Sequence, residues 1–312
     1  MASDPRPIQP VSRRRVSGGP ERRPERKRAP NLVGLGVAAL VGIGVGAGVM
    51  LLVSPSHAPP PVDRPGGVSG DGYNNGGAQG YLAPGAVQAM QILPPPPAAG
   101  SARAESDRQV FLATRKLADT PRWVQARADS DQSVAATLKN FSCALGADLG
   151  PASAPATSAL LDRFAKDQAP VVEQAKSGFK QPRPFLSSPG GLCIPRSDEL
   201  VRSPDYPSGH ATWGWAVALI LAEAAPEQEG AILARGRAYG ESRVICGAHS
   251  ASAVEAGRMV GASLVSAAHV SPSFRGDLES ARMELASLRR SGHPPDPAMC
   301  ARESAALAKP AY

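Results

Sequence analysis

The sequence predicts an all-α protein, a compact helical bundle domain preceded by one N-terminal apolar helix and a disordered linker. Beyond about residue 101, apolar residues recur with helical spacing, and no alternating stretch is long enough for a convincing strand. The chain has 312 residues, of which 42% are hydrophobic, so it can bury a sizeable core. Proline and glycine gather outside these periodic segments, as expected for connecting loops.

The first 30 residues form a basic tail that we expect to be cytoplasmic. They carry nine Lys or Arg against Asp4, Glu21 and Glu25, which accounts for nearly all of the net charge of +7. The rest of the chain is close to neutral. Its charge therefore gives no reason to expect nucleic-acid binding.

Residues 31–53 form an uncharged apolar segment, long enough at about 1.5 Å per residue to cross a hydrocarbon core of roughly 30 Å. The basic tail should stay in the cytoplasm, which places the following domain in the periplasm. We expect a retained transmembrane signal anchor. The alternative is a cleaved leader, since Ser56-His57-Ala58 resembles a cleavage site, although the proline that follows would hinder cleavage. Glycines four residues apart would let two anchors pack, which makes a homo-oligomer one expectation.

Residues 54–91 are expected to be a Pro- and Gly-rich linker, and residues 92–312 the helical domain. The expected helices of this domain are residues 107–117, 132–149, 158–175, 208–225, 227–246, 249–268, 274–291 and 299–308.

The first three expected helices are separated from the others by a loop rich in Pro and Gly, residues 181–207. Residues 107–117 and 132–149 place apolar residues near 3.6-residue spacing. In 158–175, Leu160, Leu161 and Phe164 contribute to a core-facing stripe.

The later helices begin with residues 208–225, an apolar helix that Pro226 stops. The same proline suits the first turn of 227–246. Residues 249–268 are rich in Ala, Gly and Ser, a composition that allows close approach of helices.

The four cysteines are Cys143, Cys193, Cys246 and Cys300. They show no CxxC or Cys/His ligand spacing, so no zinc, and no other cofactor, is expected. In an exported domain they permit two disulfides with three connectivities. We expect at least one disulfide and leave the partners open, since Cys246 could equally be a buried thiol.

Ser208-Gly209-His210 follows Pro207, at the start of an expected helix. Free amides and the helix dipole make such an N-terminus an anion site. The simpler interpretation is that Ser208 only caps the helix. His210 alone would more often be a structural histidine than a catalyst.

Three cationic residues and a second histidine lie in short segments on either side of this motif. Lys176 and Arg183 are separated by six residues at a helix end, while Arg243 and His249 lie at the junction of two helices. Each alone is compatible with a solvated surface. Together they are the groups needed to hold a tetrahedral oxyanion while a histidine nitrogen attacks it.

The series Lys-x6-Arg-Pro, Pro-Ser-Gly-His and Ser-Arg-x5-His resembles the signature of the type-2 phosphatidic acid phosphatase and vanadium haloperoxidase superfamily. The segments TPRWVQARADSD, YPSGHATWGWAVALILAE and ESRVICGAHSASAVEAGRMVG look closest to the bacterial class A non-specific acid phosphatases. The resemblance covers about residues 92 to 290. It implies an all-helical, metal-independent, exported enzyme acting on small phosphomonoesters.

Carried to this chain, the resemblance implies roles for seven residues. His249 would be the nucleophile that forms a phosphohistidine, and His210 the general acid. Contacts to the phosphate oxygens would come from Lys176, Arg183, Ser208, Gly209 and Arg243. An acidic optimum would follow because His210 must be protonated.

The chain departs from the family pattern His-x3-Asp, because Ala253 follows His249 at the fourth position. A carboxylate there would hold the imidazole through Nδ1. If His249 opens a helix, Glu255 points away, so Ser252, a backbone carbonyl or water would accept that hydrogen bond.

Two hypotheses remain open: a phosphatase with reduced activity, or an inactive phosphate-binding pseudophosphatase. An integral lipid phosphatase is disfavoured because only one spanning segment is expected. On the first hypothesis, Ala253→Asp should raise hydrolysis.

Overall fold

The computed structural model describes residues 79–310 and 312, and these are all-helical, with no strand among them. The predicted basic tail, the anchor at 31–53 and most of the linker lie outside the described residues. Within the described part, no helix is both long and apolar enough to cross a bilayer.

All eight helices predicted within residues 92–312 are present, with shifted ends, and three short helices of the described residues were not predicted. The helices are α1 Ala89–Ile92, α2 Ala102–Arg115, α3 Pro121–Ala128, α4 Val134–Leu145, α5 Pro155–Phe179, α6 Asp198–Arg202, α7 Gly209–Ala224, α8 Glu229–Ile245, α9 Ala251–Ala268, α10 Pro272–Arg290 and α11 Pro297–Leu307. The unpredicted helices are α1, α3 and α6.

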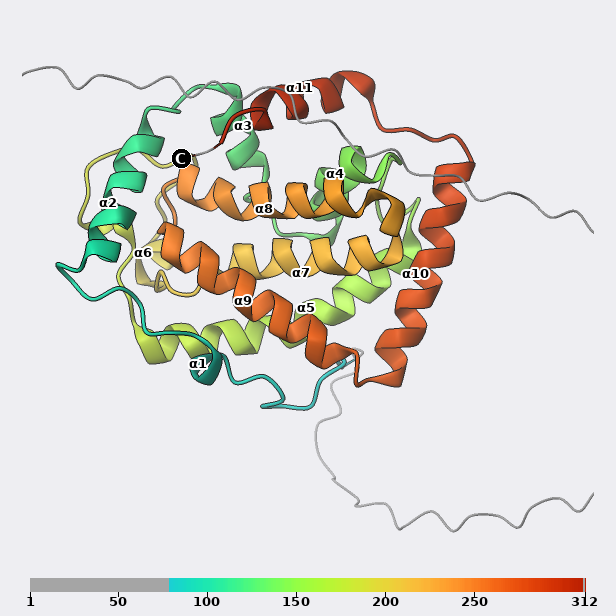
Figure 1. Cartoon of the computed structure of the whole chain (residues 1–312), viewed down its shortest axis with the longest axis horizontal. Helices are drawn as coiled ribbons and strands as arrows, with labels where there is room; N and C mark the ends of the chain where they lie inside the picture. The colour runs from blue at the N-terminus through green and yellow to red at the C-terminus, as the bar shows by residue number, and fades with distance from the viewer. Residues whose placement is uncertain (1–78, 311) are drawn as a thin grey trace, which may run out of the picture. The chain divides into compact units, whose positions relative to one another are not determined.

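Helix α7 forms the centre of the domain and packs between α8 and α9, with α5 and α10 also against it (Figure 1). Its residues are apolar almost all round, as expected for a helix buried on every side. Gly257 and Gly261 of α9 face the α7 backbone: a Cβ at these glycines would lie 2.5 Å from Ser208 O and 2.6 Å from Thr212 O. The predicted close approach is therefore confirmed, and it fixes the start of α7 beside the start of α9.

The folded domain begins before residue 92, the boundary expected from the sequence. The backbone amides of Tyr81 and Leu82 donate to Asp167 of α5 at 2.7 and 3.1 Å. The Tyr81 ring packs edge-on against Phe274, with centroids 5.2 Å apart. Residues 79–91 are therefore part of the helical unit, because the buried Asp167 carboxylate and an aromatic contact hold them on α5 and α10.

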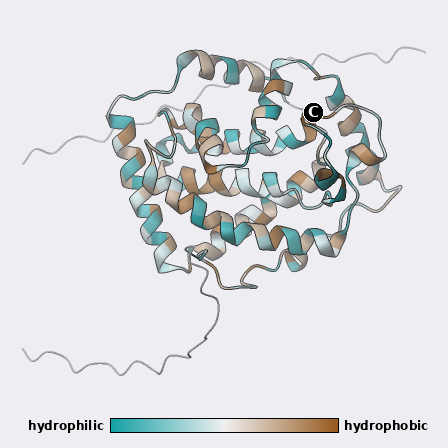
Figure 2. Ribbon diagram, turned by 180° about the vertical axis from the view of Figure 1, so that it is seen from behind, coloured by the Kyte–Doolittle hydropathy of each residue, from teal (hydrophilic) through white to brown (hydrophobic). Residues whose placement is uncertain are grey.

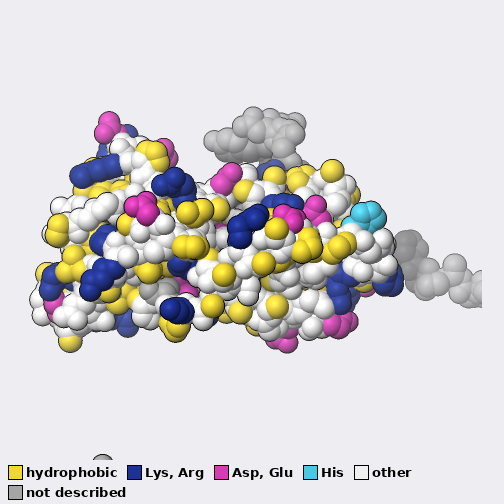
Figure 3. Space-filling model, turned by 90° about the horizontal axis from the view of Figure 1, so that it is seen from above, with side chains coloured by type: hydrophobic (Ala, Val, Ile, Leu, Met, Phe, Trp, Pro, Cys, Tyr) yellow, Lys and Arg dark blue, Asp and Glu magenta, His cyan; other side chains and the backbone are white. Residues whose placement is uncertain are grey.

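The outer helices carry hydrophilic and hydrophobic residues along the same ribbon, as amphipathic helices do (Figure 2). On the face shown in Figure 3, Lys and Arg side chains are interspersed with Asp and Glu. No large basic patch is seen on that face, in agreement with the nearly neutral charge of this part of the sequence.

All four cysteines form disulfides. Cys143 of α4 bonds Cys300 of α11, and Cys193 bonds Cys246. The second bridge ties the loop between α5 and α7 to the end of α8. Cys193 N also donates to Cys246 O at 3.1 Å. This loop is therefore fixed against the segment that carries Arg243 and His249.

Candidate active site

Three cations from separate elements lie around His249. Lys176 is in the last turn of α5, Arg183 in the loop that follows, and Arg243 in the last turn of α8; all three are buried. Lys176 Nζ and Arg183 Nη2 both donate to Ser203 Oγ, at 2.8 and 3.1 Å. Arg183 Nη1 lies 3.0 Å from His249 Nε2. The structure thus brings together the cations that the sequence places in two separate motifs.

Arg243 carries the clearest sign of an anion site. Its side chain is 2% exposed, and its Nε and Nη1 have no hydrogen-bond partner. Burial, and to a smaller extent Arg183, lower the pKa of its guanidinium to about 10. A buried cation with two unpaired donors is costly unless an anion receives them.

The start of α7 supplies the neutral part of the site. Ser208 is the N-cap, and its Oγ accepts from Ala211 N at 3.3 Å, so the simple capping interpretation is correct. Capping by Ser208 is compatible with an anion site, because Gly209 begins a sixteen-residue helix. The first amides and the positive end of the dipole of that helix lie beside Ser208.

His210 follows in the first turn of α7, and its Nε2 lies 3.0 Å from Ser130 O. A carbonyl only accepts, so this nitrogen carries a proton. Burial first, and then Arg243, hold the pKa of His210 well below its usual value. His210 is therefore neutral at pH 7 when no anion offsets the cations.

A buried network that the sequence did not reveal holds the Arg243 segment. Ser242 Oγ donates to Asp129 Oδ2 at 2.5 Å and accepts from Arg122 Nη1 at 2.9 Å. Arg235 forms a buried ion pair with Asp129, with Nη2 2.5 Å from Oδ1. These contacts join α8 to Arg122 in α3 and to Asp129 at the C-terminal end of α3. The segment TPRWVQARADSD, which carries two of these residues, was the only signal for them.

His249 does not open a helix, contrary to the expectation from the sequence. Gly247 has a φ of +77°, and Ser250 caps α9, its Oγ accepting from Ala253 N at 3.2 Å. His249 therefore precedes the helix. Helical spacing does not place position 253 on the same face as His249, so the neighbours of its ring must be identified from the contacts.

The two ring nitrogens of His249 meet different groups. Nδ1 lies 2.7 Å from the backbone oxygen of Asp205 and 3.0 Å from its Oδ1. Nε2 faces Arg183, which can only donate. The proton therefore belongs on Nδ1, and the lone pair on Nε2 points towards the cations. Burial, together with Arg183, Lys176 and Arg243, keeps the pKa of His249 well below its usual value, so the ring is neutral.

Comparisons with known proteins identify the family of this chain. A profile of the PAP2 superfamily matches residues 156–277, the range that holds all seven predicted site residues. An acid phosphatase of Zymomonas mobilis is 40% identical over 218 residues, which cover 70% of this chain and 83% of that protein. This chain belongs to the bacterial acid phosphatases of the PAP2 superfamily. Non-specific acid phosphatases of Providencia stuartii and Salmonella typhimurium are 36% and 35% identical, over 66% and 64% of this chain and 84% and 80% of their own lengths.

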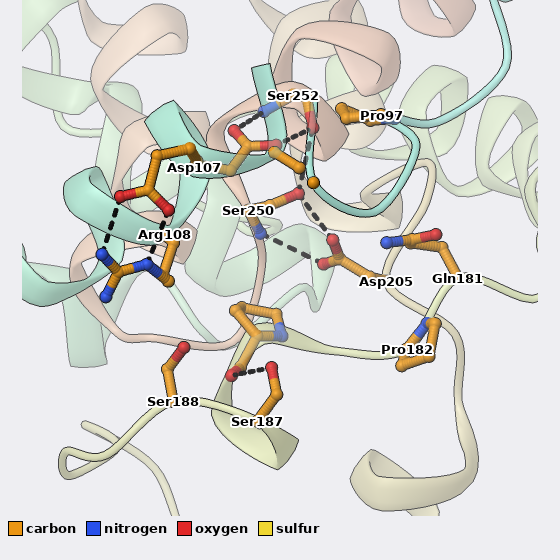
Figure 4. Close-up of a pocket in the computed structure, with 14 residues that line it drawn as sticks. Pro97, Asp107, Arg108, Gln181, Pro182, Ser187, Ser188, Asp205, Ser250 and Ser252 are labelled. Atoms are coloured by element: carbon orange, nitrogen blue, oxygen red, sulfur yellow. Dashed lines mark hydrogen bonds and ion pairs between the residues drawn. The ribbon is translucent and has the colours of Figure 1, made fainter. Parts of the chain in front are cut away.

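Within this PAP2 superfamily chain, Asp205 is the acidic group that sequence reasoning missed at the site. It lies in the loop before α7, three residues ahead of Ser208, and is 2% exposed. Its Oδ1 accepts from Ser250 N at 3.1 Å and its Oδ2 from Ser250 Oγ at 2.6 Å (Figure 4). Burial raises the pKa of Asp205 to about 6, against the lowering effect of Ser250 and Arg183.

A pocket of about 500 Å³ adjoins the site on the side of Asp205 and Ser250 (Figure 4). None of the three cations and neither histidine lines it, so the pocket is not the anion cradle. Among the residues that the structure describes, no group of three His, Cys, Asp or Glu could hold a metal ion.

Proposed function

We propose that this domain is an acid phosphatase that hydrolyses phosphate monoesters through a phosphohistidine on His249. The observation that carries this proposal is the buried Arg243 with two unpaired donors, beside a neutral imidazole whose Nε2 lone pair faces Arg183. A phosphate group placed among Lys176, Arg183 and Arg243 would receive the missing hydrogen bonds and lie within reach of that lone pair.

In the first step the Nε2 lone pair attacks phosphorus and the bond from phosphorus to the ester oxygen breaks. His210 gives a proton to the departing oxygen, which leaves as an alcohol. In the second step the oxygen of a water attacks phosphorus, the phosphorus–nitrogen bond breaks with its electron pair returning to Nε2, and His210 takes a proton from that water. Inorganic phosphate leaves, and both histidines return to their starting states.

The low pKa of His210 in the empty site fits this cycle. Burial is the largest cause of this low pKa, and Arg243, Arg183 and Lys176 further disfavour a proton on His210. A bound phosphate dianion offsets these charges, so His210 gains its proton when substrate arrives. The predicted acidic optimum therefore refers to the complex with substrate.

The full-length protein, purified in detergent, tests the proposal through hydrolysis of p-nitrophenyl phosphate. We expect turnover in the wild type and none above background in His249→Ala, because the nucleophile is gone. The surface residue His269, which pairs with Glu223, supplies the matched control His269→Ala, for which we expect unchanged turnover.

Acid- and base-quenched reactions with labelled substrate identify the intermediate. A protein-bound phosphate that is stable in base and labile in acid would support the phosphohistidine. A wild type that binds vanadate yet shows no turnover and no labelling would instead identify the pseudophosphatase predicted as the alternative.

We also propose that the domain is periplasmic and tethered to the inner membrane by residues 31–53, or released if the leader is cleaved. Two disulfides support an oxidising compartment. Alkaline extraction of membranes tests the tether: an anchored protein stays in the pellet, and a released one is found in the supernatant.

A further inference from the structure

We propose that Asp205 is the positioning residue for His249, supplying from the loop before α7 the carboxylate that is missing at position 253. This inference rests on the proposed function, since it concerns the same reaction. It replaces the expectation of reduced activity, which depended on the absence of such a carboxylate.

The contact is specific to the nitrogen that the reaction does not use. His249 Nδ1 lies 3.0 Å from Asp205 Oδ1 and 2.7 Å from the Asp205 backbone oxygen. Both acceptors belong to one residue and both favour a proton on Nδ1. The donor on the other side, Arg183 Nη1, independently requires an unprotonated Nε2. Two sets of contacts thus select the tautomer that can attack phosphorus.

The carboxylate does work that the backbone oxygen cannot do. When Nε2 bonds to phosphorus the ring becomes an imidazolium, and a nearby negative charge stabilises it in a site that excludes water. Asp205 is held for this purpose by two hydrogen bonds from Ser250, the residue that follows the nucleophile.

Other acidic side chains near this junction do not contact His249. Asp107 bonds the backbone N and the Oγ of Ser252, the latter in a very short contact, and so caps the start of α9. Glu255 pairs with Arg103 on the surface. Asp205 is therefore the carboxylate that the fold delivers to this imidazole.

Position 253 adjoins the same cluster. Ala253 N donates to Ser250 Oγ, the hydroxyl that bonds Asp205, and Ala253 O accepts from Ser208 N at 2.9 Å. A carboxylate introduced at this buried position would join a cluster that already has one. Ala253→Asp is therefore expected not to raise activity in the wild-type background.

The test compares Asp205→Asn with the wild type and with the matched control Asp107→Asn, in the full-length protein. Asn is nearly isosteric and keeps the backbone oxygen, so the change removes mainly the charge. We expect kcat to fall on the order of 100-fold, in the range seen when one preorganised electrostatic group is removed. The affinity for inorganic phosphate should change by less than about threefold, because the cations bind phosphate and Asp205 acts on the nucleophile. Asp107→Asn should keep kcat within about threefold.

Four results would overturn the inference. A wild type without turnover would refute the proposed function and this inference with it. An active wild type whose kcat persists in Asp205→Asn would refute the inference alone. Equal losses in the Asp205 and Asp107 variants would show a merely structural role, and a tenfold or larger gain in Ala253→Asp would show that the carboxylate was still missing.

A measurement on the wild type covers the case in which Asp205→Asn does not fold. Nitrogen-15 NMR of the imidazoles, assigned with His249→Ala, should show His249 protonated on Nδ1. Protonation on Nε2 would overturn the inference.

Discussion

The disulfide between Cys193 and Cys246 should support both the stability and the activity of this domain, and the two effects can be separated. Cys246 lies three residues after Arg243 and three before His249. Its partner lies in the loop that carries Arg183 and Asp205. Replacing both cysteines by serine removes this cross-link without changing any of the seven predicted site residues.

The loss of stability follows from the length of the chain between the cysteines. The bridge closes a separation of 53 residues, for which the chain-entropy relation gives about 4 kcal/mol. For a domain of this size that corresponds to a fall in Tm of about 8 to 16 °C. Removing the other bridge, Cys143–Cys300, with a separation of 157 residues, should cost about 5 kcal/mol by the same relation.

The second bridge is the matched control, since it joins α4 to α11 and contacts none of the site residues. Thermal unfolding should show both double-serine variants destabilised. At a temperature where both are folded, only the Cys193/Cys246 variant should lose activity, by about tenfold in kcat/KM, because the segment between Arg243 and His249 is less well positioned. Equal activity in the two variants would refute the proposed link between this bridge and the site.

Two further predictions concern the cations. Burial and Arg183 lower the pKa of Lys176 to about 8, so the lysine is charged below that pH and neutral above it. In a pH–rate profile, kcat/KM should therefore fall above about pH 8. The variant Lys176→Arg, whose side chain stays charged, should not show that decline. A decline of the same midpoint in the arginine variant would contradict this assignment. Arg243→Met should weaken vanadate binding about 100-fold by calorimetry, since two charge-assisted hydrogen bonds are lost, without lowering the Tm of the unliganded protein. The control Arg237→Met, on the surface, should leave the affinity for vanadate unchanged. A lower Tm of unliganded Arg243→Met would contradict the prediction, because it would show that Arg243 stabilises the fold without an anion.

Long amphipathic or apolar helices could be predicted from the sequence because their spacing is a local property. Helix α3 was missed because it has only eight residues and carries two arginines. It is stabilised by tertiary contacts, the hydrogen bonds of Arg122 and Asp129 to α8, which local spacing does not reveal. Its start was nevertheless visible, since Thr120 is an N-cap and Pro121 occupies the first turn. That the domain begins before residue 92 was missed because Asp167, the buried partner of Tyr81 and Leu82, is far away in sequence.

The residues of the anion site were found because each lies in a short segment with a recognisable spacing. The group beside Nδ1 was sought four residues after His249, on the assumption of a helix. The helix begins only at Ala251, and the group comes from 44 residues upstream. One of the alternatives from the sequence, a backbone carbonyl, is indeed present, but a carboxylate accompanies it.

The packing of α7 against α9 places the segment that carries Asp205 beside the first turn of α9, the turn that holds Ala253. Ser208 N donates to Ala253 O, so the chain just before α7 and the first turn of α9 are joined directly beside the nucleophile. The proposed reaction calls for a negative charge near Nδ1 of His249 and sets no condition on which of these two segments supplies it. On this proposal, Asp205 would do the work that the family pattern gives to an aspartate at position 253. It follows that the absence of the acidic residue from the second segment is no evidence for an inactive enzyme until the first segment has been inspected.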